Sequence, residues 1–326
     1  MNEPLLTLRV ARKQAATERI CTLELEALPG QTLPPFSPGA HLELHLAEGL
    51  VRQYSLVNAP AESQLYRLGV LLDPQSRGGS RAVHEAVQPG QTLQVRGPRN
   101  HFELAPAARH HLLLAGGIGI TPLLSMAQHL ASPAQQGSGA SFSLHYAARS
   151  RAQAAYLERL AEPDLAAQVH HHFDDGPPEQ RLDLGALLAQ PEPGNHVYVC
   201  GPQGFIEATL AAARGARWPE EQLHYEYFGA SVQAQAGDTG FEIELARSGK
   251  TVWVAPDCSA ADALTEAGVP LMTACLQGVC GTCLTPVLAG QPDHRDAYLS
   301  AEEKAANQQF LPCCSRSLSA RLVLDL

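Results

Sequence analysis

The sequence lacks the features of a membrane protein, a nucleic-acid-binding protein or a secreted protein. No apolar run approaches the roughly 20 residues that span a bilayer. The first residues, MNEPLLTLRVARKQ, have neither the basic region nor the apolar region of a secretion signal. The formal net charge of -10 argues against a nucleic-acid partner, because such binding usually needs a basic face. We therefore expect a cytoplasmic protein.

The chain of 326 residues is long enough for two or three domains, each with its own core. It contains eight cysteines. In a chain of this size without a signal sequence, cysteines indicate metal or redox chemistry more often than disulfides.

Three segments with different patterns follow one another. Residues 1–105 contain short alternating stretches such as HLELHL (41–46), separated by Pro and Gly turns, which predict an antiparallel β-barrel. Residues 106–230 alternate strand and helix patterns, among them a helical stretch QAAYLERLAE (153–162), and predict a parallel α/β sheet with nucleotide chemistry at the strand ends. Residues 231–239 are small and polar and read as a linker, and residues 240–326 form a third domain.

The third domain carries a cysteine motif. Cys275, Cys280 and Cys283 have the spacing C-x4-C-x2-C, and Cys313 follows after 29 intervening residues. This is the plant-type spacing for a [2Fe–2S] cluster. A structural zinc site is the alternative, but zinc ribbons usually show C-x2-C pairs.

The region from about Phe241 to Leu326 resembles plant-type ferredoxins over its whole length. Cys313 and Cys314 are adjacent, so either could be the fourth ligand. Comparison with relatives that carry one cysteine before Ser-Arg favours Cys313.

Two glycine-containing turns follow predicted strands in the second segment. GGIGITP (116–122) opens a helix, and CGP (200–202) follows the strand VYV. Close backbone approach and exposed N–H groups suit a pyrophosphate, whereas a tight structural turn is the alternative. Together the turns resemble the NAD(P) half of the ferredoxin–NADP reductase superfamily. That resemblance implies an NAD site made by Gly116, Gly117, Ile118, Gly119, Thr121, Pro122, Cys200, Gly201 and Pro202, with Cys200 positioning the nicotinamide ring.

The first segment contains two further motifs of the same superfamily. RQYSL (52–56) resembles its R-x-Y-S flavin motif, and SRGGS (76–80) resembles the loop that holds the FMN phosphate in the phthalate dioxygenase reductase family. The resemblance implies that Arg52 contacts phosphate, Tyr54 packs on the isoalloxazine and Ser55 hydrogen-bonds the flavin, where it also has a catalytic role. It further implies flavin contacts from Gln53, Val70, Leu72, Gly78, Gly79, Ser80 and Phe228. A turn without a ligand and core packing of Phe228 are the alternatives.

The whole chain resembles the reductase components of Rieske-type oxygenases, in the group of phthalate dioxygenase reductase and vanillate demethylase reductase. The resemblance implies a flavin barrel, an NAD domain and a C-terminal β-grasp ferredoxin domain. It implies hydride transfer from NADH to FMN and single-electron transfer through the [2Fe–2S] cluster to a terminal Rieske-type oxygenase. Arg149 and Arg151 lie near the place where NADPH-specific enzymes bind phosphate, so NADPH stays an alternative.

We expect a monomer that docks its oxygenase transiently near the cluster loop. A docking surface with the acidic residues Asp293, Asp296, Glu302 and Glu303 is one hypothesis. A redox-sensing iron–sulfur flavoprotein and an electron-transfer subunit of a dehydrogenase complex are the alternatives to an oxygenase reductase.

Overall fold

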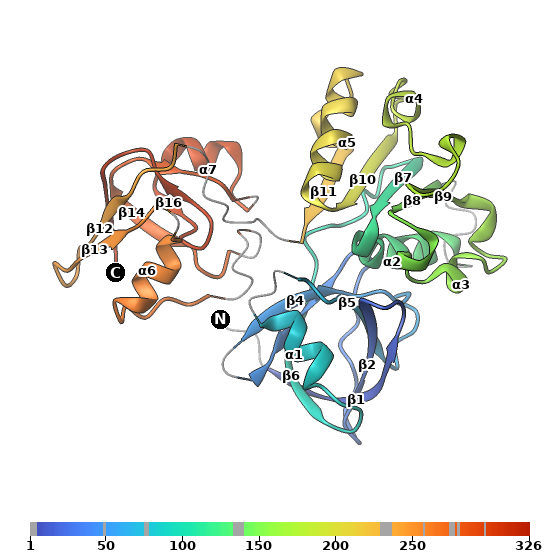
Figure 1. Cartoon of the computed structure of the whole chain (residues 1–326), viewed down its shortest axis with the longest axis horizontal. Coiled ribbons are helices and arrows are strands. Elements are labelled where there is room, and N and C mark those ends of the chain that lie inside the picture. The colour runs from blue at the N-terminus through green and yellow to red at the C-terminus, as the bar shows by residue number, and fades with distance from the viewer. Residues whose placement is uncertain are drawn as a thin grey trace. The chain divides into compact units, whose positions relative to one another are not determined.

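The computed structural model describes residues 5–47, 50–74, 78–132, 140–228, 237–256, 258–273, 278, 281–296 and 298–326. The chain divides into two compact units, Met1–Glu226 and Tyr227–Leu326. In Figure 1 the first unit is coloured from blue to yellow and the second from orange to red. Within the described residues, no helix has the length and apolar character needed to cross a membrane.

The first unit begins with an antiparallel barrel. Its six strands have the order β4-β3-β6-β1-β2-β5, and an isolated antiparallel bridge between Leu56 and Leu68 joins the two edges. Inward-facing aliphatic residues such as Leu23, Leu42 and Val95 are fully buried in its core. The elements are β1 (Leu6–Ala15), β2 (Ile20–Ala27), β3 (His41–His45), β4 (Val51–Ser55), β5 (Tyr66–Leu71), α1 (Gly79–Glu85) and β6 (Thr92–Arg99).

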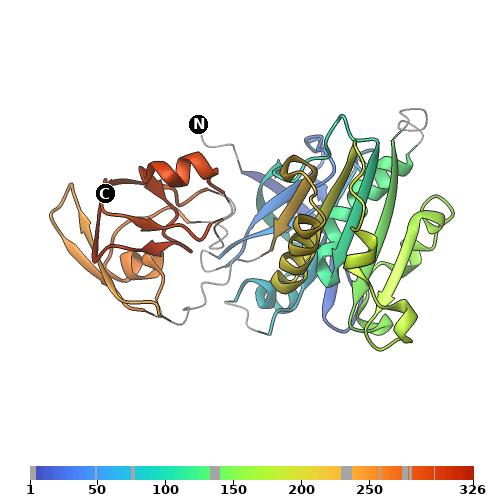
Figure 2. The ribbon, with the colours of Figure 1, turned by 90° about the horizontal axis from the view of Figure 1, so that it is seen from above.

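A five-stranded sheet with the order β11-β10-β7-β8-β9 completes the first unit. The strand pairs β10–β7, β7–β8 and β8–β9 are parallel, and helices α2 and α5 pack on the sheet (Figure 2). The alternation of strand and helix patterns predicted this arrangement. The elements are β7 (His110–Gly116), α2 (Ile120–Ala131), β8 (Ser141–Ala148), α3 (Leu157–Leu160), β9 (Val169–Phe173), α4 (Leu184–Leu187), β10 (Asn195–Gly201), α5 (Gln203–Gly215) and β11 (Leu223–Tyr227).

The helix predicted over residues 153–162 is wrong in its extent, because α3 contains only four residues. Tyr156, directly before α3, adopts a left-handed conformation with φ of 62°. Its hydroxyl lies 3.2 Å from Thr22 Oγ1, on barrel strand β2. This tertiary contact overrides the helical preference of the segment, since local propensity is a weak force.

The second unit contains a mixed sheet of order β13-β12-β18-β14-β16 and a small sheet of β15 and β17. Helix α6 covers the mixed sheet with the buried residues Ala260, Ala263 and Leu264. The elements are β12 (Phe241–Leu245), β13 (Thr251–Val254), α6 (Ala260–Glu266), β14 (Thr285–Ala289), β15 (Pro292–Asp293), α7 (Ala301–Ala306), β16 (Gln309–Phe310), β17 (Arg316–Ser317) and β18 (Arg321–Leu324). This is the α+β arrangement expected for a ferredoxin-like unit.

Candidate cofactor sites

Glycines allow two turns of the parallel sheet to approach each other closely. Strand β7 ends at Gly116 and continues through a 3₁₀ turn, Gly117–Gly119, into α2. A Cβ atom on Gly119 would lie 2.2 Å from the carbonyl oxygen of Cys200, and one on Gly201 would lie 2.9 Å from the Cα of Gly116. Any side chain at Gly119 or Gly201 would therefore force the two turns apart.

The backbone of the same turn is accessible at one residue. At Gly117, φ is +53°, and a Cβ atom would meet no described atom within 4 Å. Backbone N–H groups at the start of a helix with open approach suit a pyrophosphate. The donor set therefore fits the predicted dinucleotide. Thr121 shapes this turn, because its Oγ1 donates to the carbonyl oxygen of Ile118 at 3.0 Å.

Cys200 lies at the end of β10, in register with Ala115 of β7. The residue is completely buried. Burial, with a further contribution from the nearby Glu226, raises the pKa of the thiol well above its ordinary value. The thiol is therefore neutral at physiological pH and unsuited to act as a nucleophile, which fits a positioning role.

Glu226, on β11, connects the barrel with the parallel sheet, and the sequence analysis missed it. Ser55 Oγ, at the end of β4, donates to Glu226 Oε2 at 3.3 Å. Burial raises the pKa of the Glu226 carboxyl to about 8, although the hydrogen bond from Ser55 lowers it. The carboxyl is thus mostly protonated at pH 7. The one available signal was a single carboxylate within the strand sequence HYEYF.

The structure brings together the predicted flavin-phosphate residues. A Cβ atom on Gly79 would lie 2.4 Å from Arg52 Cγ, so the Arg52 side chain lies directly against the start of α1. Gly78 precedes this helix with φ of 90°, a conformation that favours glycine. Ser80 Oγ accepts a hydrogen bond from the backbone N–H of Asp73 at 3.2 Å, which connects the first turn of α1 to the chain just after β5.

The residues of β4 divide between the two faces of the strand. Tyr54 pairs with Leu42 and packs against the barrel core, and burial raises the pKa of its hydroxyl above the ordinary range. Gln53 and Ser55 lie on the opposite face. Among the described residues, the buried Nε2 of Gln53 has no hydrogen-bond partner. A buried amide donor without a partner is costly, so it fits a ligand with an acceptor such as a flavin.

Val70, Leu72 and Phe228 differ in their surroundings. Val70 is fully buried in the barrel core, and its carbonyl oxygen lies 2.9 Å from His84 Nε2. Leu72 is half-buried; its backbone N–H donates to the carbonyl oxygen of Arg19 at 2.7 Å, and its carbonyl oxygen accepts from Arg19 Nη2 at 2.9 Å. Phe228, partly buried, directly follows β11 and belongs to the second unit. Their flavin contacts stay predictions.

Two of the four predicted cluster ligands, Cys275 and Cys280, lie outside the described residues. The other two, Cys283 and Cys313, are buried and lie in one core cluster with Leu311. Interaction with Cys283 lowers the pKa of the Cys313 thiol, but interaction with Cys314 and burial together raise it above its ordinary value. Within the part of the chain that the structure describes, no group of three or more ligating side chains could hold a metal ion.

Two glycines of the cluster loop have left-handed conformations. Gly278 has φ of 71° and Gly281 has φ of 70°. A Cβ atom on Gly278 would lie 2.4 Å from Cys314 Sγ, and one on Gly281 would lie 2.3 Å from the ring of Tyr298. Both positions thus require glycine for two independent reasons, which fits a loop that wraps a cluster closely.

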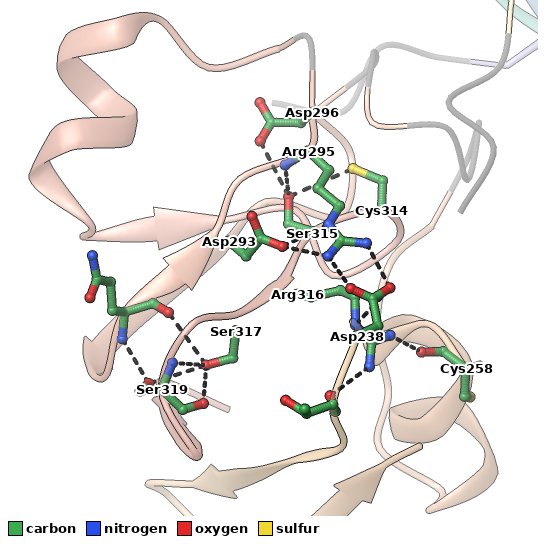
Figure 3. A network of polar contacts seen from close by, with 12 residues as sticks. Asp238, Cys258, Asp293, Arg295, Asp296, Cys314, Ser315, Arg316, Ser317 and Ser319 are labelled. Carbon is green, nitrogen blue, oxygen red and sulfur yellow. Dashed lines mark hydrogen bonds and ion pairs between the residues drawn. The ribbon is translucent and has the colours of Figure 1, made fainter. Parts of the chain in front are cut away.

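A polar network lies beside the turn that contains Cys314 and Ser315 (Figure 3). Arg295 donates to Asp238 at 2.9 Å and to Asp293 at 2.7 Å. The side chain of Arg316 is almost completely buried and lies 3.7 Å from Asp238, and it donates to the carbonyl oxygen of Cys258 at 2.7 Å. The network connects Asp238, at the end of the predicted linker, to β15 and β17.

Contacts of the same region correct the acidic docking hypothesis at Asp296. Asp296 is buried and accepts hydrogen bonds from Leu299 N at 2.8 Å and Ser315 Oγ at 3.3 Å. Asp293 pairs with Arg295, and Glu303 forms a capping box with Ser300 at the start of α7. Asp296 therefore cannot belong to an exposed docking surface, whereas Glu302 and Glu303 are exposed and their part in docking stays a prediction.

Comparisons with known proteins agree with this geometry. Residues 243–318 match the 2Fe-2S iron-sulfur cluster binding domain family. Residues 91–223 match the dimethylamine monooxygenase subunit DmmA-like, N-terminal domain family. The vanillate O-demethylase oxidoreductase of Pseudomonas sp. (strain HR199 / DSM 7063) is 46% identical over 317 residues, 97% of this chain and 98% of that protein. The carnitine monooxygenase reductase subunit of Escherichia coli (strain K12) is 40% identical over 323 residues, 98% of this chain and 97% of that protein.

Two solved structures are similar over almost the whole chain. Phthalate dioxygenase reductase, described as a modular structure for electron transfer from pyridine nucleotides to [2Fe–2S], has a TM-score of 0.77 at 36% identity and covers 99% of this chain and 98% of its own. An intact type IV self-sufficient cytochrome P450 monooxygenase has a TM-score of 0.78 at 38% identity, covering 99% of this chain but 41% of its own. The chain therefore belongs to the family of oxygenase reductase components that includes vanillate O-demethylase oxidoreductase and phthalate dioxygenase reductase, NADH-dependent oxidoreductases with FMN and a [2Fe–2S] cluster.

Proposed function

We propose that this chain supplies electrons from NADH to a separate terminal oxygenase or demethylase of the Rieske type. When bound, FMN and the [2Fe–2S] cluster convert a two-electron hydride donor into a source of single electrons. One observation carries the proposal at residue level. Ser55 of the barrel and Glu226 of the parallel sheet are hydrogen-bonded, and Glu226 acts electrostatically on Cys200. Predicted flavin and nicotinamide residues are thus joined within one unit.

The side chains of this site orient the ligands and are themselves mostly uncharged. Cys200, a neutral thiol, positions the nicotinamide ring. Glu226 holds the Ser55 hydroxyl in place, and Ser55 orients the flavin. Because the pKa of the Glu226 carboxyl is about 8, the site holds little negative charge at pH 7. No residue here needs to act as a general acid or base.

The remaining residues hold the cofactors in this proposal. Arg52, Gly78, Gly79 and Ser80 bind the FMN phosphate, and the glycine turns at 116–119 and 200–202 bind the NADH pyrophosphate. Cys275, Cys280, Cys283 and Cys313 ligate the cluster. The proposal retains a division into a flavin domain, 1–105, a nucleotide domain, 106–230, a linker, 231–239, and a ferredoxin domain, 240–326.

The test is anaerobic EPR of the purified protein after addition of NADH. We expect the signal of a reduced [2Fe–2S] centre, and we expect a Cys283→Ala variant to bleach its flavin without that signal. Flavin bleaching without the signal in the natural protein would refute the proposed electron path. A slower response to NADPH than to NADH would support the nucleotide preference.

The partner is the second part of the proposal. We expect a monomer that binds its oxygenase transiently. The similarity to part of a cytochrome P450 monooxygenase chain makes a P450 the second candidate acceptor. Stopped-flow mixing of the NADH-reduced protein with a Rieske oxygenase or a P450 separates the two. Purification in fixed stoichiometry with a dehydrogenase would contradict transient docking.

A further inference from the structure

Helix α2 carries a stripe of buried polar side chains. Thr121, Ser125 and Gln128 are separated by four and three residues, so they lie on one face of the helix. Their exposed fractions are 1%, 0% and 5%. A buried polar group is costly unless it has a hydrogen-bond partner, and apolar side chains would pack a helix equally well. The polar character of this face therefore points to a role beyond packing.

The stripe is bonded to the barrel just beyond the proposed flavin residue Ser55. Ser125 Oγ donates to the carbonyl oxygen of Asn58 at 2.8 Å. Gln128 Nε2 donates to the carbonyl oxygen of Val57 at 2.7 Å. Because Val57 and Asn58 follow Ser55 by two and three positions, α2 is attached to the chain segment that leaves the proposed flavin site.

The first turn of α2 contacts the barrel as well. A Cβ atom on Gly69 of β5 would lie 2.7 Å from Thr121 Cγ2, so the Thr121 side chain lies directly against this glycine. The proposed nucleotide turn, Gly117–Gly119, immediately precedes α2. The helix therefore contacts the barrel both at the nucleotide turn and two turns further along.

The barrel carbonyl groups that accept these bonds are fixed in place. The backbone N–H of Val57 donates to the carbonyl oxygen of Arg67 at 2.8 Å. The side chain of Asn58 accepts from the backbone N–H of Arg67 at 2.8 Å and donates to the carbonyl oxygen of Leu65 at 3.1 Å. The segment after Ser55 is thus a rigid anchor for α2.

The amide of Gln128 is itself oriented by a charged pair. Arg159 Nε donates to Gln128 Oε1 at 3.0 Å, and the other two guanidinium nitrogens of Arg159 donate to Asp164 at 2.9 and 2.7 Å. A guanidinium group can only donate, so the amide oxygen must face Arg159 and the NH₂ group must face the carbonyl groups of Val57 and Leu124. The orientation of Gln128 is therefore determined by its surroundings.

We propose that Ser125 and Gln128 are positioning residues for hydride transfer, which hold the nucleotide turn at a fixed distance from Ser55 and the flavin. Both act through α2 and contact no reactant. The hydride, one proton with two electrons, leaves NADH, which becomes NAD⁺, and reduces FMN. Misplacement of the reactants by about 1 Å lowers such a rate by up to about a hundredfold. This inference rests on the proposed function, because it needs the flavin at Ser55 and the dinucleotide at the glycine turn.

The test compares Ser125→Ala and Gln128→Met with the natural protein. The control is Tyr66→Phe, which removes a buried donor to the carbonyl oxygen of Pro34, a bond that lies within the barrel alone. Each FMN-loaded protein is titrated with tetrahydro-NADH, an analogue that cannot donate a hydride. The titration gives a dissociation constant and the charge-transfer absorbance between the nucleotide and flavin rings, neither of which depends on turnover. Melting temperatures report the stability of each variant.

We expect both variants of α2 to lower the charge-transfer absorbance at saturation about twofold or more, while the dissociation constant changes less than about threefold. Reduction of the flavin by saturating NADH, followed by stopped-flow absorbance, should be about tenfold slower in Gln128→Met. Tyr66→Phe should match the natural protein in absorbance and in rate, even where its melting temperature falls as far. Ser125→Ala, the smaller change, gives the same test where Gln128→Met fails to fold.

The natural absorbance and rate in both variants of α2 would overturn the inference and leave the two side chains a role in stability only. An equal loss in Tyr66→Phe would overturn it too, because any missing buried hydrogen bond would then have the same effect. A natural protein whose flavin is not bleached by NADH would instead refute the proposed function.

Discussion

At the scale of single residues, Glu226 is the clearest case of a side chain whose property depends on its surroundings. Burial favours the neutral carboxyl in the folded protein and raises its pKa from 4.5 to about 8. When the pKa of a group is higher in the folded than in the unfolded state, the group contributes stability that is fully present below the unfolded pKa. That contribution is lost as pH rises through the folded pKa. Glu226 therefore destabilises the cofactor-free protein at alkaline pH.

We expect Glu226→Gln to remove this destabilisation at alkaline pH. Glutamine keeps the shape and can still accept from Ser55, but it cannot ionise. The variant should match the natural protein at pH 5 and exceed its unfolding free energy by about 3 kcal/mol at pH 8 and above. Thermal melts of both apoproteins from pH 5 to pH 9 measure this, and parallel curves would contradict it.

Gly278 offers a second test at this scale. Gly278→Ala adds a methyl group both to a left-handed residue and to the space taken by Cys314 Sγ. Gly268 is the matched control, because its φ is 74° and a Cβ there would meet nothing within 4 Å. We expect Gly268→Ala to cost about 1 kcal/mol and Gly278→Ala about 3 kcal/mol, with loss of iron from the latter alone. Equal melting temperatures and iron contents would show that the contact with Cys314 is unimportant.

At the scale of elements, helix α1 is held by a single cation. Lys13 Nζ on β1 donates to the carbonyl oxygens of Val83, His84 and Val87 at 2.9, 2.6 and 2.8 Å. All three ammonium protons are thus used at the end of the helix whose start carries the proposed phosphate residues. A cation at this end also interacts favourably with the helix dipole.

We expect Lys13→Met to weaken FMN binding about tenfold by loosening α1, a change of about 1.4 kcal/mol. The control is Arg12→Met, which removes an exposed cation from the same strand and should leave FMN affinity unchanged. Fluorescence titration of the apoproteins with FMN measures both dissociation constants. Equal affinities for the two variants would mean that the position of α1 does not control FMN binding.

The parallel sheet carries histidines that fold in the neutral form. Burial lowers the pKa of His111, His145 and His224 to about 4, and neighbouring histidines such as His170 and His172 add to the effect at His145. A lowered folded-state pKa gives stability that is present above the unfolded value of 6.5 and is lost as pH falls towards 4.

We expect the unfolding free energy to fall by about 1 kcal/mol for each of these three imidazoles between pH 7 and pH 5. His145→Gln should reduce this fall by the contribution of one imidazole, because glutamine cannot take up the proton. Denaturant unfolding at the two pH values measures the effect. An unchanged pH dependence in the variant would contradict the assignment.

At the scale of the whole molecule, Asp238 lies at the end of the predicted linker, inside the second unit. It accepts from Arg295 and pairs with Arg316, whose side chain is almost completely buried. Removing one partner of a buried ion network leaves an uncompensated charge. Asp238 thus determines how firmly the end of the predicted linker is fixed.

We expect Asp238→Asn to destabilise the second unit by about 3 kcal/mol while flavin reduction by NADH stays unchanged. The readouts are the melting of the cluster absorbance and the rate of flavin bleaching, which report on different units. Glu244→Gln, which removes a carboxylate from an exposed ion pair with Arg321, is the control and should change neither. A slowed flavin reduction in Asp238→Asn would show that the effect is not confined to the second unit.

The sequence by itself determined the features that depend on neighbouring residues. The cysteine spacing, the glycine turns and the alternation of strand and helix patterns predicted an antiparallel barrel, a parallel sheet and a ferredoxin-like unit in the correct order. These signals are local, because a ligand loop or a left-handed turn needs particular residues within a few positions.

Only the tertiary structure decided the features that depend on burial by distant segments. Ser55 and Glu226 are 171 positions apart, so no pattern could predict their contact. The buried position of Asp296 and the left-handed Tyr156 also escaped prediction, as did the contact of Cys314 with Gly278. In each case the surroundings contributed by the rest of the chain outweigh the preference of the residue itself, and those surroundings exist only after folding.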